Sequence, residues 1–133
     1  MTFEELREKH NKESQKKGQK SYSEANIQAE FFKHVWIFLK EDQRKLIFHV
    51  PNEGKRSKYF ARSSGITSGV SDIIMLIPNS EFHGLLIEFK TDKGNQSNNQ
   101  KEFEKQAVNS GYKYVVCRSA YDAIKEVQNY LKN

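Results

Sequence analysis

The chain of 133 residues contains one cysteine, Cys117, so no disulfide can form within it. Nothing in its cysteine content therefore points to an oxidising compartment. No run approaches the roughly 20 apolar residues that a membrane-spanning helix needs, and the N-terminus has no apolar secretion segment. We therefore expect a soluble, cytoplasmic protein.

Several common functional motifs are also missing from the sequence. It has no Walker A motif, no dinucleotide-binding glycine pattern and no Ser/His/Asp arrangement, so we expect no nucleotide cofactor. Its four histidines show no metal-ligand spacing, and we interpret them as structural or exposed. The formal net charge of +5 favours a polyanionic partner, although solubility alone also explains a charge of this size.

Hydrophobic periodicity predicts one α/β domain with a mixed four-stranded sheet flanked by helices. The expected order is a helix over 21–40, strands over 46–50, 70–77 and 85–90, a helix over 97–111, a strand over 113–118 and a final helix from 119. A helix between the last two strands makes them parallel, whereas the preceding hairpin is antiparallel. The domain is expected to span 21–133. Residues 1–20 are nearly all polar, so we expect a mobile segment with at most a short helical turn and little burial.

Charged residues interrupt the two central apolar runs. Asp72 lies in the first run, and Glu88 and Lys90 lie in the second. Because side chains alternate along a strand, Glu88 and Lys90 share a face, and a hairpin can place Asp72 across from Glu88 on that face. Burying carboxylates is costly unless a cation or several donors neutralise them, and a divalent metal is a common solution. The plain alternatives are a turn-capping role for Asp72 and an ordinary ion pair between Glu88 and Lys90.

Two of the predicted helices begin with the pattern of a capping box, at 21–24 and at 97–100. Glu24 is therefore either a capping glutamate or a residue on the packed side of its helix, in line with Gln28. Gln100 can cap its helix and also belong to a site.

These residues, in this order of elements, resemble the PD-(D/E)XK nuclease superfamily, whose core is a restriction-endonuclease-like αβββαβ arrangement. The closer resemblance is to the VRR-NUC (virus-type replication-repair nuclease) group. It rests on Gln28, His49-Val50-Pro51-Asn52-Glu53-Gly54-Lys55-Arg56, Gly69-Val70-Ser71-Asp72, Glu88-Phe89-Lys90, and Ser97 with Gln100 before Gly111-Tyr112. Ser71 stands where the superfamily has proline.

The resemblance implies a Mg²⁺- or Mn²⁺-dependent endonuclease that hydrolyses DNA phosphodiesters and leaves a 5′-phosphate and a 3′-hydroxyl. It implies that Asp72, Glu88 and the Phe89 carbonyl hold the metal, with Glu24 contributing directly or through water. Lys90 would contact the attacking water and the scissile phosphate. Gln100 would position Lys90, the water or a phosphate oxygen.

Small free-standing members of the group are associated with branched DNA such as four-way (Holliday) junctions, as in DNA repair and phage infection. Each chain would hold one site, so cutting two strands predicts a homodimer. Four cations predict a DNA-binding segment: Lys55, Arg56, Lys58 and Arg62. The rival hypotheses are a DNA-binding module without its own cleavage activity, and a structural protein with an incidental ion pair.

Overall fold

The computed structural model describes residues 2–15, 23–51 and 64–133. Its elements, in chain order, are α1 (Phe3–Gln15), α2 (Glu24–Phe38), α3 (Glu41–Arg44), β1 (Ile47–His49), β2 (Ile73–Met75), β3 (Leu85–Phe89), α5 (Asn98–Asn109), β4 (Lys113–Cys117) and α6 (Ala120–Leu131). Within these ranges, no helix is both long and apolar enough to cross a bilayer. The predicted sequence of helices and strands is confirmed, with α1 and α3 in addition.

The four strands form one mixed sheet in the order β1-β2-β3-β4. β1 pairs with β2, and β2 with β3, in antiparallel fashion, whereas β3 and β4 are parallel. α5 lies between β3 and β4 in the chain and makes the crossover that a parallel pair requires. The predicted α/β architecture is thus confirmed.

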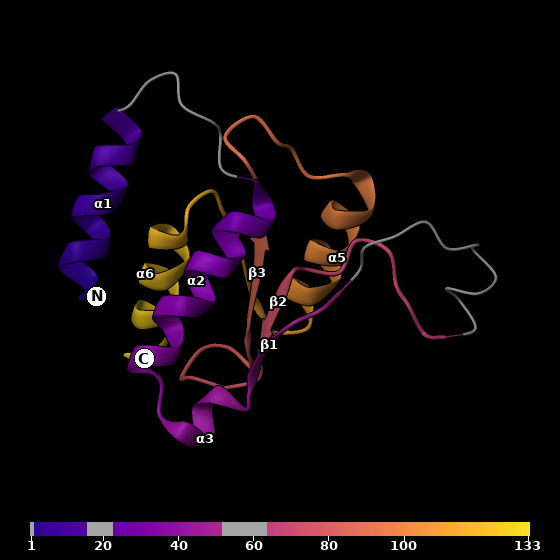
Figure 1. Ribbon diagram of the computed structural model, residues 1–133. Helices are drawn as coiled ribbons and strands as arrows, with labels where there is room; N and C mark the ends of the chain where they lie inside the picture. The colour runs from indigo at the N-terminus through magenta and orange to yellow at the C-terminus, as the bar shows by residue number, and fades with distance from the viewer. Residues whose placement is uncertain (1, 16–22, 52–63) are drawn as a thin grey trace.

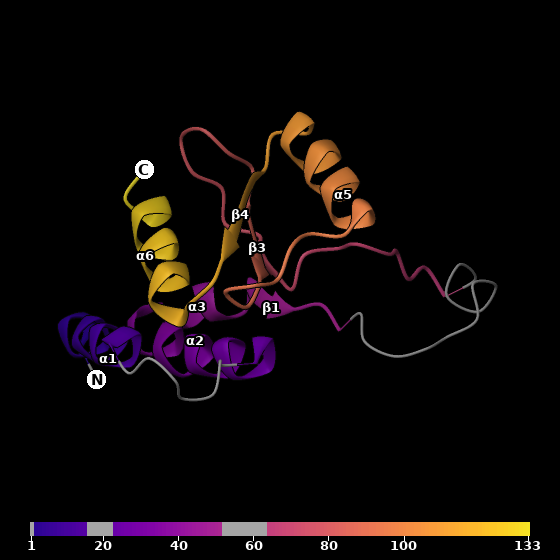
Figure 2. The same ribbon diagram turned by 90° about the horizontal axis from the view of Figure 1, so that it is seen from above.

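Helices cover the sheet unequally on its two faces (Figures 1 and 2). α1, α2 and α6 pack on one face and enclose the larger core, which includes Phe31, Ile87 and Val127. Among the helices that the structure describes, only α5 covers the other face, where Leu86, Ala107 and Tyr114 form a smaller core. Strand alternation from Leu86 places Glu88 on this face as well.

β3 is the strand that both layers bury. All five of its residues are buried, because it is central in the sheet and helices cover both of its faces. This environment explains its nearly continuous apolar run, since a strand buried on both sides shows no alternation of polar residues. Glu88 is the exception within β3, with 2% of its surface exposed.

The helix in the N-terminal segment is longer than its polar composition predicts. α1 has 13 residues rather than a single turn. Leu6 is only 4% exposed, and the Phe3 ring stacks on Tyr121 with centroids 5.3 Å apart. Two apolar side chains on one helical face thus dock α1 on α6, and Leu6 is the only buried one among the side chains of α1 that the structure describes. Mobility of residues 1–20 stays a prediction.

The start of α2 also differs from its prediction. The Ser23 hydroxyl accepts a hydrogen bond from the Asn26 N–H, so Ser23 is the N-cap and Glu24 is the first helical residue. Glu24 is not the third residue of a capping box, as the pattern at 21–24 suggested. The second predicted capping box is confirmed, since Ser97 and Gln100 exchange both of its hydrogen bonds at the start of α5.

Candidate functional site

Asp72 directly precedes β2 and lies opposite Glu88 when the antiparallel register of β2 and β3 is continued by one residue. Its Oδ2 accepts a hydrogen bond from the Phe89 N–H at 2.7 Å. Its main-chain carbonyl bonds both the Val50 N–H and the His49 ring, each at 2.8 Å. Neighbouring strands on both sides therefore hold Asp72, and its predicted position across from Glu88 is confirmed.

Glu88 is the buried acidic group of the site. Its Oε1 accepts a hydrogen bond from the Gln100 side-chain amide at 2.9 Å. Its Oε2 is buried, and no N–H group or ordinary O–H group of the described residues donates to it, so its only close polar neighbour of note is the Asp72 carboxyl group. A buried carboxylate oxygen that accepts no such hydrogen bond has a large desolvation cost when the group is ionised. A bound cation would offset that cost.

The electrostatic surroundings of Glu88 favour its neutral form. Burial raises the pKa of Glu88 to about 8, and both the negative charge of Asp72 and a hydrogen bond between the two carboxyl groups add to this effect. The ammonium of Lys90 acts in the opposite direction, whereas the charge of Glu24 raises the pKa further. An additional cation in this position would relieve the repulsion between the carboxylates.

Lys90 extends from the end of β3 on the same face as Glu88, as the alternation of side chains predicts. Its Nζ lies 4.0 Å from Glu88 Oε1, and its side chain is 11% exposed. A separation of 4.0 Å is at the outer limit of an ion pair. The ammonium is therefore close enough to influence Glu88 and remains able to donate to another group.

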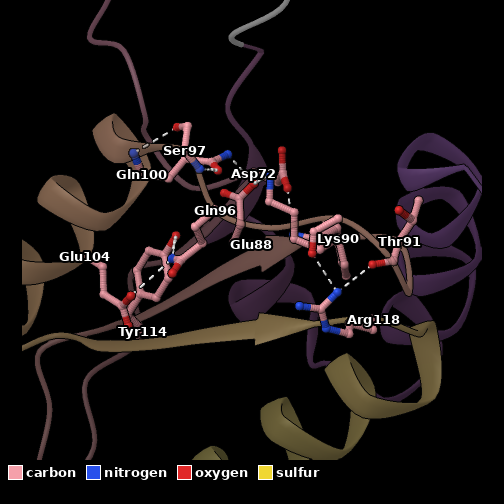
Figure 3. A network of polar contacts seen from close by, with 12 residues as sticks. Asp72, Glu88, Lys90, Thr91, Gln96, Ser97, Gln100, Glu104, Tyr114 and Arg118 are labelled. Atoms are coloured by element: carbon pink, nitrogen blue, oxygen red, sulfur yellow. Dashed lines mark hydrogen bonds and ion pairs between the residues drawn. The ribbon is translucent and has the colours of Figure 1, made fainter.

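Gln100 joins the start of α5 to this site (Figure 3). Its side-chain carbonyl accepts the Ser97 N–H at 2.8 Å, while its amide donates to Glu88. Both ends of the side chain are thus fixed, and capping and the contact with Glu88 occur together. The structure places Gln100 against Glu88 and not against Lys90.

The loop before Asp72 is packed against the same helix start. Gly69 has a φ of +85°, and a β-carbon there would lie 2.4 Å from the carbonyl carbon of Asn99. The Asn99 side chain also donates to the Ser68 hydroxyl at 2.8 Å. This close approach requires glycine, because any side chain would separate the loop from α5. Asp72 and Gln100 are consequently held in one unit.

The donor set fits a hard divalent cation. Asp72 and Glu88 provide carboxylate oxygens, Glu88 Oε2 is one of them, and Mg²⁺ or Mn²⁺ prefers oxygen ligands. Within the part of the chain that the structure describes, no cluster of three or more His, Cys, Asp or Glu side chains is arranged to hold a metal. Two carboxylates therefore form the core of the candidate site, and the Phe89 carbonyl as a further ligand stays a prediction.

The structure describes Glu24, whereas the predicted DNA-binding residues between 55 and 62 lie outside the described residues. Glu24 is exposed at the first position of α2, and its charge raises the pKa of Glu88. Among the described residues it does not complete a cluster of three potential metal ligands. Its role as a ligand, direct or through water, stays a prediction. The predicted DNA-binding residues Lys55, Arg56, Lys58 and Arg62 lie outside the described residues.

The structure adds a residue that motif reasoning missed. Arg118 follows β4, and its Nη1 donates to the carbonyls of Thr91 and Gly94, in the loop after Lys90. The parallel register, which pairs Phe89 with Cys117, places Arg118 beside Lys90. No signal in the sequence predicts this contact, because local periodicity does not set the register of two parallel strands joined by a helix.

The sequence and the fold of this chain both match a known protein family. The sequence pattern of the VRR-NUC domain matches residues 8–121, from α1 to the start of α6. A solved structure of a VRR-NUC domain protein is 26% identical, with a TM-score of 0.72 and coverage of 85% of this chain and 91% of that chain. No curated protein matches the chain. The chain therefore belongs to the VRR-NUC domain family, a nuclease-type family.

Proposed function

We propose that this protein is a Mg²⁺- or Mn²⁺-dependent endonuclease that hydrolyses DNA phosphodiester bonds. Membership of a nuclease-type family supports a nuclease-like role with DNA as its substrate. The observation that carries the proposal is the pair of close carboxyl groups of Asp72 and buried Glu88 beside Lys90, in which no donor of the described residues reaches Glu88 Oε2. Two carboxylates, an ammonium and an amide at one strand end meet the needs of phosphoryl transfer, which relies on positioning and charge stabilisation.

Asp72, Glu88 and the Phe89 carbonyl would hold the cation in this proposal. When bound, such a cation supplies positive charge that polarises the scissile phosphate and lowers the pKa of water. Gln100 keeps Glu88 in one orientation through its 2.9 Å hydrogen bond. Lys90 donates to the attacking water and to a phosphate oxygen, where its charge favours the hydroxide.

The narrower substrate in this proposal is branched DNA, either a four-way junction or a flap. Each chain carries one such site, so paired cuts across a junction require two copies, and we propose a homodimer. The net charge of +5 is consistent with a polyanionic substrate. The basic residues between 55 and 62 are the proposed phosphate contacts.

A DNA-binding module without its own cleavage activity is the second candidate. One observation favours it: among the residues that the structure describes, only two carboxylates meet and no cluster of three potential ligands is arranged to hold a metal. Such a module would bind DNA in a salt-dependent way and cut none of it at any metal concentration.

Incubation of the protein with labelled duplex, flap and four-way-junction DNA tests the proposal, in Mg²⁺, in Mn²⁺ and in chelator. We expect cleavage with either metal and none in chelator. Asp72→Asn and Lys90→Met should abolish cleavage and preserve DNA binding. The matched controls are Asp122→Asn and Lys125→Met, which change the same residue types at exposed positions of α6, on the opposite side of the sheet.

Three results would count against parts of this proposal. Binding without cleavage in both metals favours the DNA-binding module. Cleavage of linear duplex but not of junctions or flaps removes the branched substrate. A single chain per particle in light scattering, both free and on a junction, removes the homodimer.

A further inference from the structure

Arg118 links the end of β4 to the loop that leaves β3. Its Nη1 donates to the main-chain carbonyls of Thr91 at 2.6 Å and Gly94 at 2.8 Å, with a longer contact of 3.4 Å to Asp92. All three contacts come from one nitrogen of an exposed side chain. One guanidinium nitrogen therefore contacts the carbonyls of a turn. A hydrogen bond from the Gly94 N–H to the Thr91 carbonyl, at 3.0 Å, closes this turn.

The loop 91–94, which Arg118 contacts, lies close to the aliphatic part of the Lys90 side chain. A β-carbon built on Gly94 would be 3.5 Å from Lys90 Cδ and 3.2 Å from the Thr91 hydroxyl oxygen. Gly94 therefore lies close to Lys90 Cδ, which helps to explain why the Lys90 side chain is only 11% exposed. Figure 3 shows Lys90 and Thr91 close to the guanidinium of Arg118 at this end of the sheet.

Lys90 directly follows β3, where the pairing between β3 and β4 ends. Its N–H donates to the Cys117 carbonyl at 3.0 Å, and the chain leaves β4 after this contact. A lysine side chain has several rotatable bonds, so an unconfined ammonium samples many positions. Confinement of the stem therefore determines how often the ammonium points toward Glu88.

We propose that Arg118 is a positioning residue for Lys90, acting through the loop 91–94. This inference rests on the proposed nuclease function only for its effect on cleavage, since the ordering of Lys90 is measurable without cleavage. Arg118 does not touch the reacting atoms in this proposal. It holds the turn whose main chain keeps the Lys90 ammonium beside Glu88.

Three variants test the inference. Arg118→Met keeps a long apolar stem and removes the donor, whereas Arg118→Lys keeps a cation that can donate to the same carbonyls. Arg44→Met is the matched control, because Arg44 also donates to a main-chain carbonyl, that of Trp36 at 3.0 Å, but does so from α3. Each protein is isotopically labelled, and NMR relaxation is measured at Lys90 Cε and at the Gly94 amide.

We expect Arg118→Met to increase the motion of Lys90 Cε and of the Gly94 amide, Arg118→Lys to restore both, and Arg44→Met to change neither. In cleavage assays, Arg118→Met should lower kcat about tenfold, with KM for DNA and the Mg²⁺ midpoint unchanged, because a misplaced group costs rate rather than binding. Arg118→Lys should recover most of this loss.

The relaxation measurement decides the inference by itself. Unchanged motion of Lys90 in Arg118→Met would overturn it, as would an increase that Arg118→Lys fails to reverse. A fall in kcat that follows a fall in melting temperature equally in Arg118→Met and Arg44→Met would also overturn it. If the wild-type protein cuts no DNA, the nuclease proposal fails, and the relaxation result still supports or overturns the positioning of Lys90.

Discussion

The Gln100 side-chain amide donates to Glu88 Oε1 at 2.9 Å, while the same side chain caps α5 through the Ser97 N–H. One residue thus connects the start of a helix to a buried carboxylate in the adjacent strand. The orientation of Glu88 depends on where α5 begins. A change at the cap and a change at the site should therefore have separable effects.

Gln100→Ala should lower the cleavage rate by about ten- to a hundredfold, because Glu88 loses the amide that donates to its Oε1 and can rotate away from the cation. Ser97→Ala removes the hydroxyl that accepts the Gln100 N–H at 3.2 Å, but leaves the Ser97 N–H in place. It should lower the free energy of unfolding by about 1 kcal/mol and leave cleavage nearly unchanged. Urea denaturation and single-turnover cleavage measure the two effects. Equal loss of cleavage in both variants would contradict a separate role at the site.

The pKa of Glu88 predicts a pH-dependent stability of the metal-free protein. Burial and the charge of Asp72 raise this pKa from 4.5 to about 8. Between these values the folded protein retains a proton that the unfolded chain releases, so the free energy of unfolding falls as pH rises through this window. Each pKa unit corresponds to about 1.4 kcal/mol. Urea denaturation in chelator between pH 5 and pH 8 should show the decline, which Glu88→Gln should flatten and Glu126→Gln should retain.

Metal binding should show the opposite trend with pH. A cation needs the ionised form of Glu88, and the raised pKa makes that form scarce at low pH. Mg²⁺ should therefore raise the melting temperature more at pH 8 than at pH 6. Glu88→Gln should abolish this increase. A melting temperature that Mg²⁺ raises equally in wild type and Glu88→Gln would place the cation elsewhere.

Gly69→Ala should separate the loop that carries Asp72 from α5. The new β-carbon would overlap the main chain of Asn99 at 2.4 Å, and the φ of +85° is unfavourable for alanine. We expect a loss of at least about 2 kcal/mol in the free energy of unfolding and a reduced stabilisation by Mg²⁺. Gly65→Ala is the control, because Gly65 has a φ of +77° with nothing within 4 Å of its β-carbon position. It should cost about 1 kcal/mol, and equal effects of the two changes would contradict the close packing.

A charged cluster attaches α1 to α2. Glu30 Oε1 lies 2.6 Å from Lys9 Nζ and 2.9 Å from His34 Nε2. Burial alone would raise the pKa of Glu30, but the hydrogen bonds with Lys9 and His34 outweigh it and lower the pKa below 4.5. This stabilisation is therefore present above pH 4.5 and is lost as pH falls through the lowered pKa.

Glu30→Gln should reduce the free energy of unfolding by about 1 kcal/mol at pH 7, with the difference from wild type shrinking in acid. Denaturation at pH 7 and at pH 3 measures both values. Glu4→Gln is the control, since Glu4 meets Arg7 only at 4.0 Å on an open surface. A difference that persists undiminished in acid would contradict the role of the ionised Glu30.

Strand alternation and hairpin pairing were sufficient to predict much of this site. Two-residue spacing placed Glu88 and Lys90 on one face, and the hairpin placed Asp72 opposite Glu88, as the register confirms. The start of α2 was harder to predict, because serines at 21 and 23 both precede Glu24 and each is an acceptable N-cap. Choosing between them depends on how the helix packs.

Local periodicity by itself determined the order of the elements and the faces on which charged residues lie, because both depend on neighbours along the chain. Only the tertiary structure decided that Glu88 is 2% exposed, that Gln100 reaches it and that Arg118 holds the loop after Lys90. These contacts join segments that are distant in sequence. Their distances depend on how α5 and β4 pack against β3, which no repeating pattern within one segment specifies.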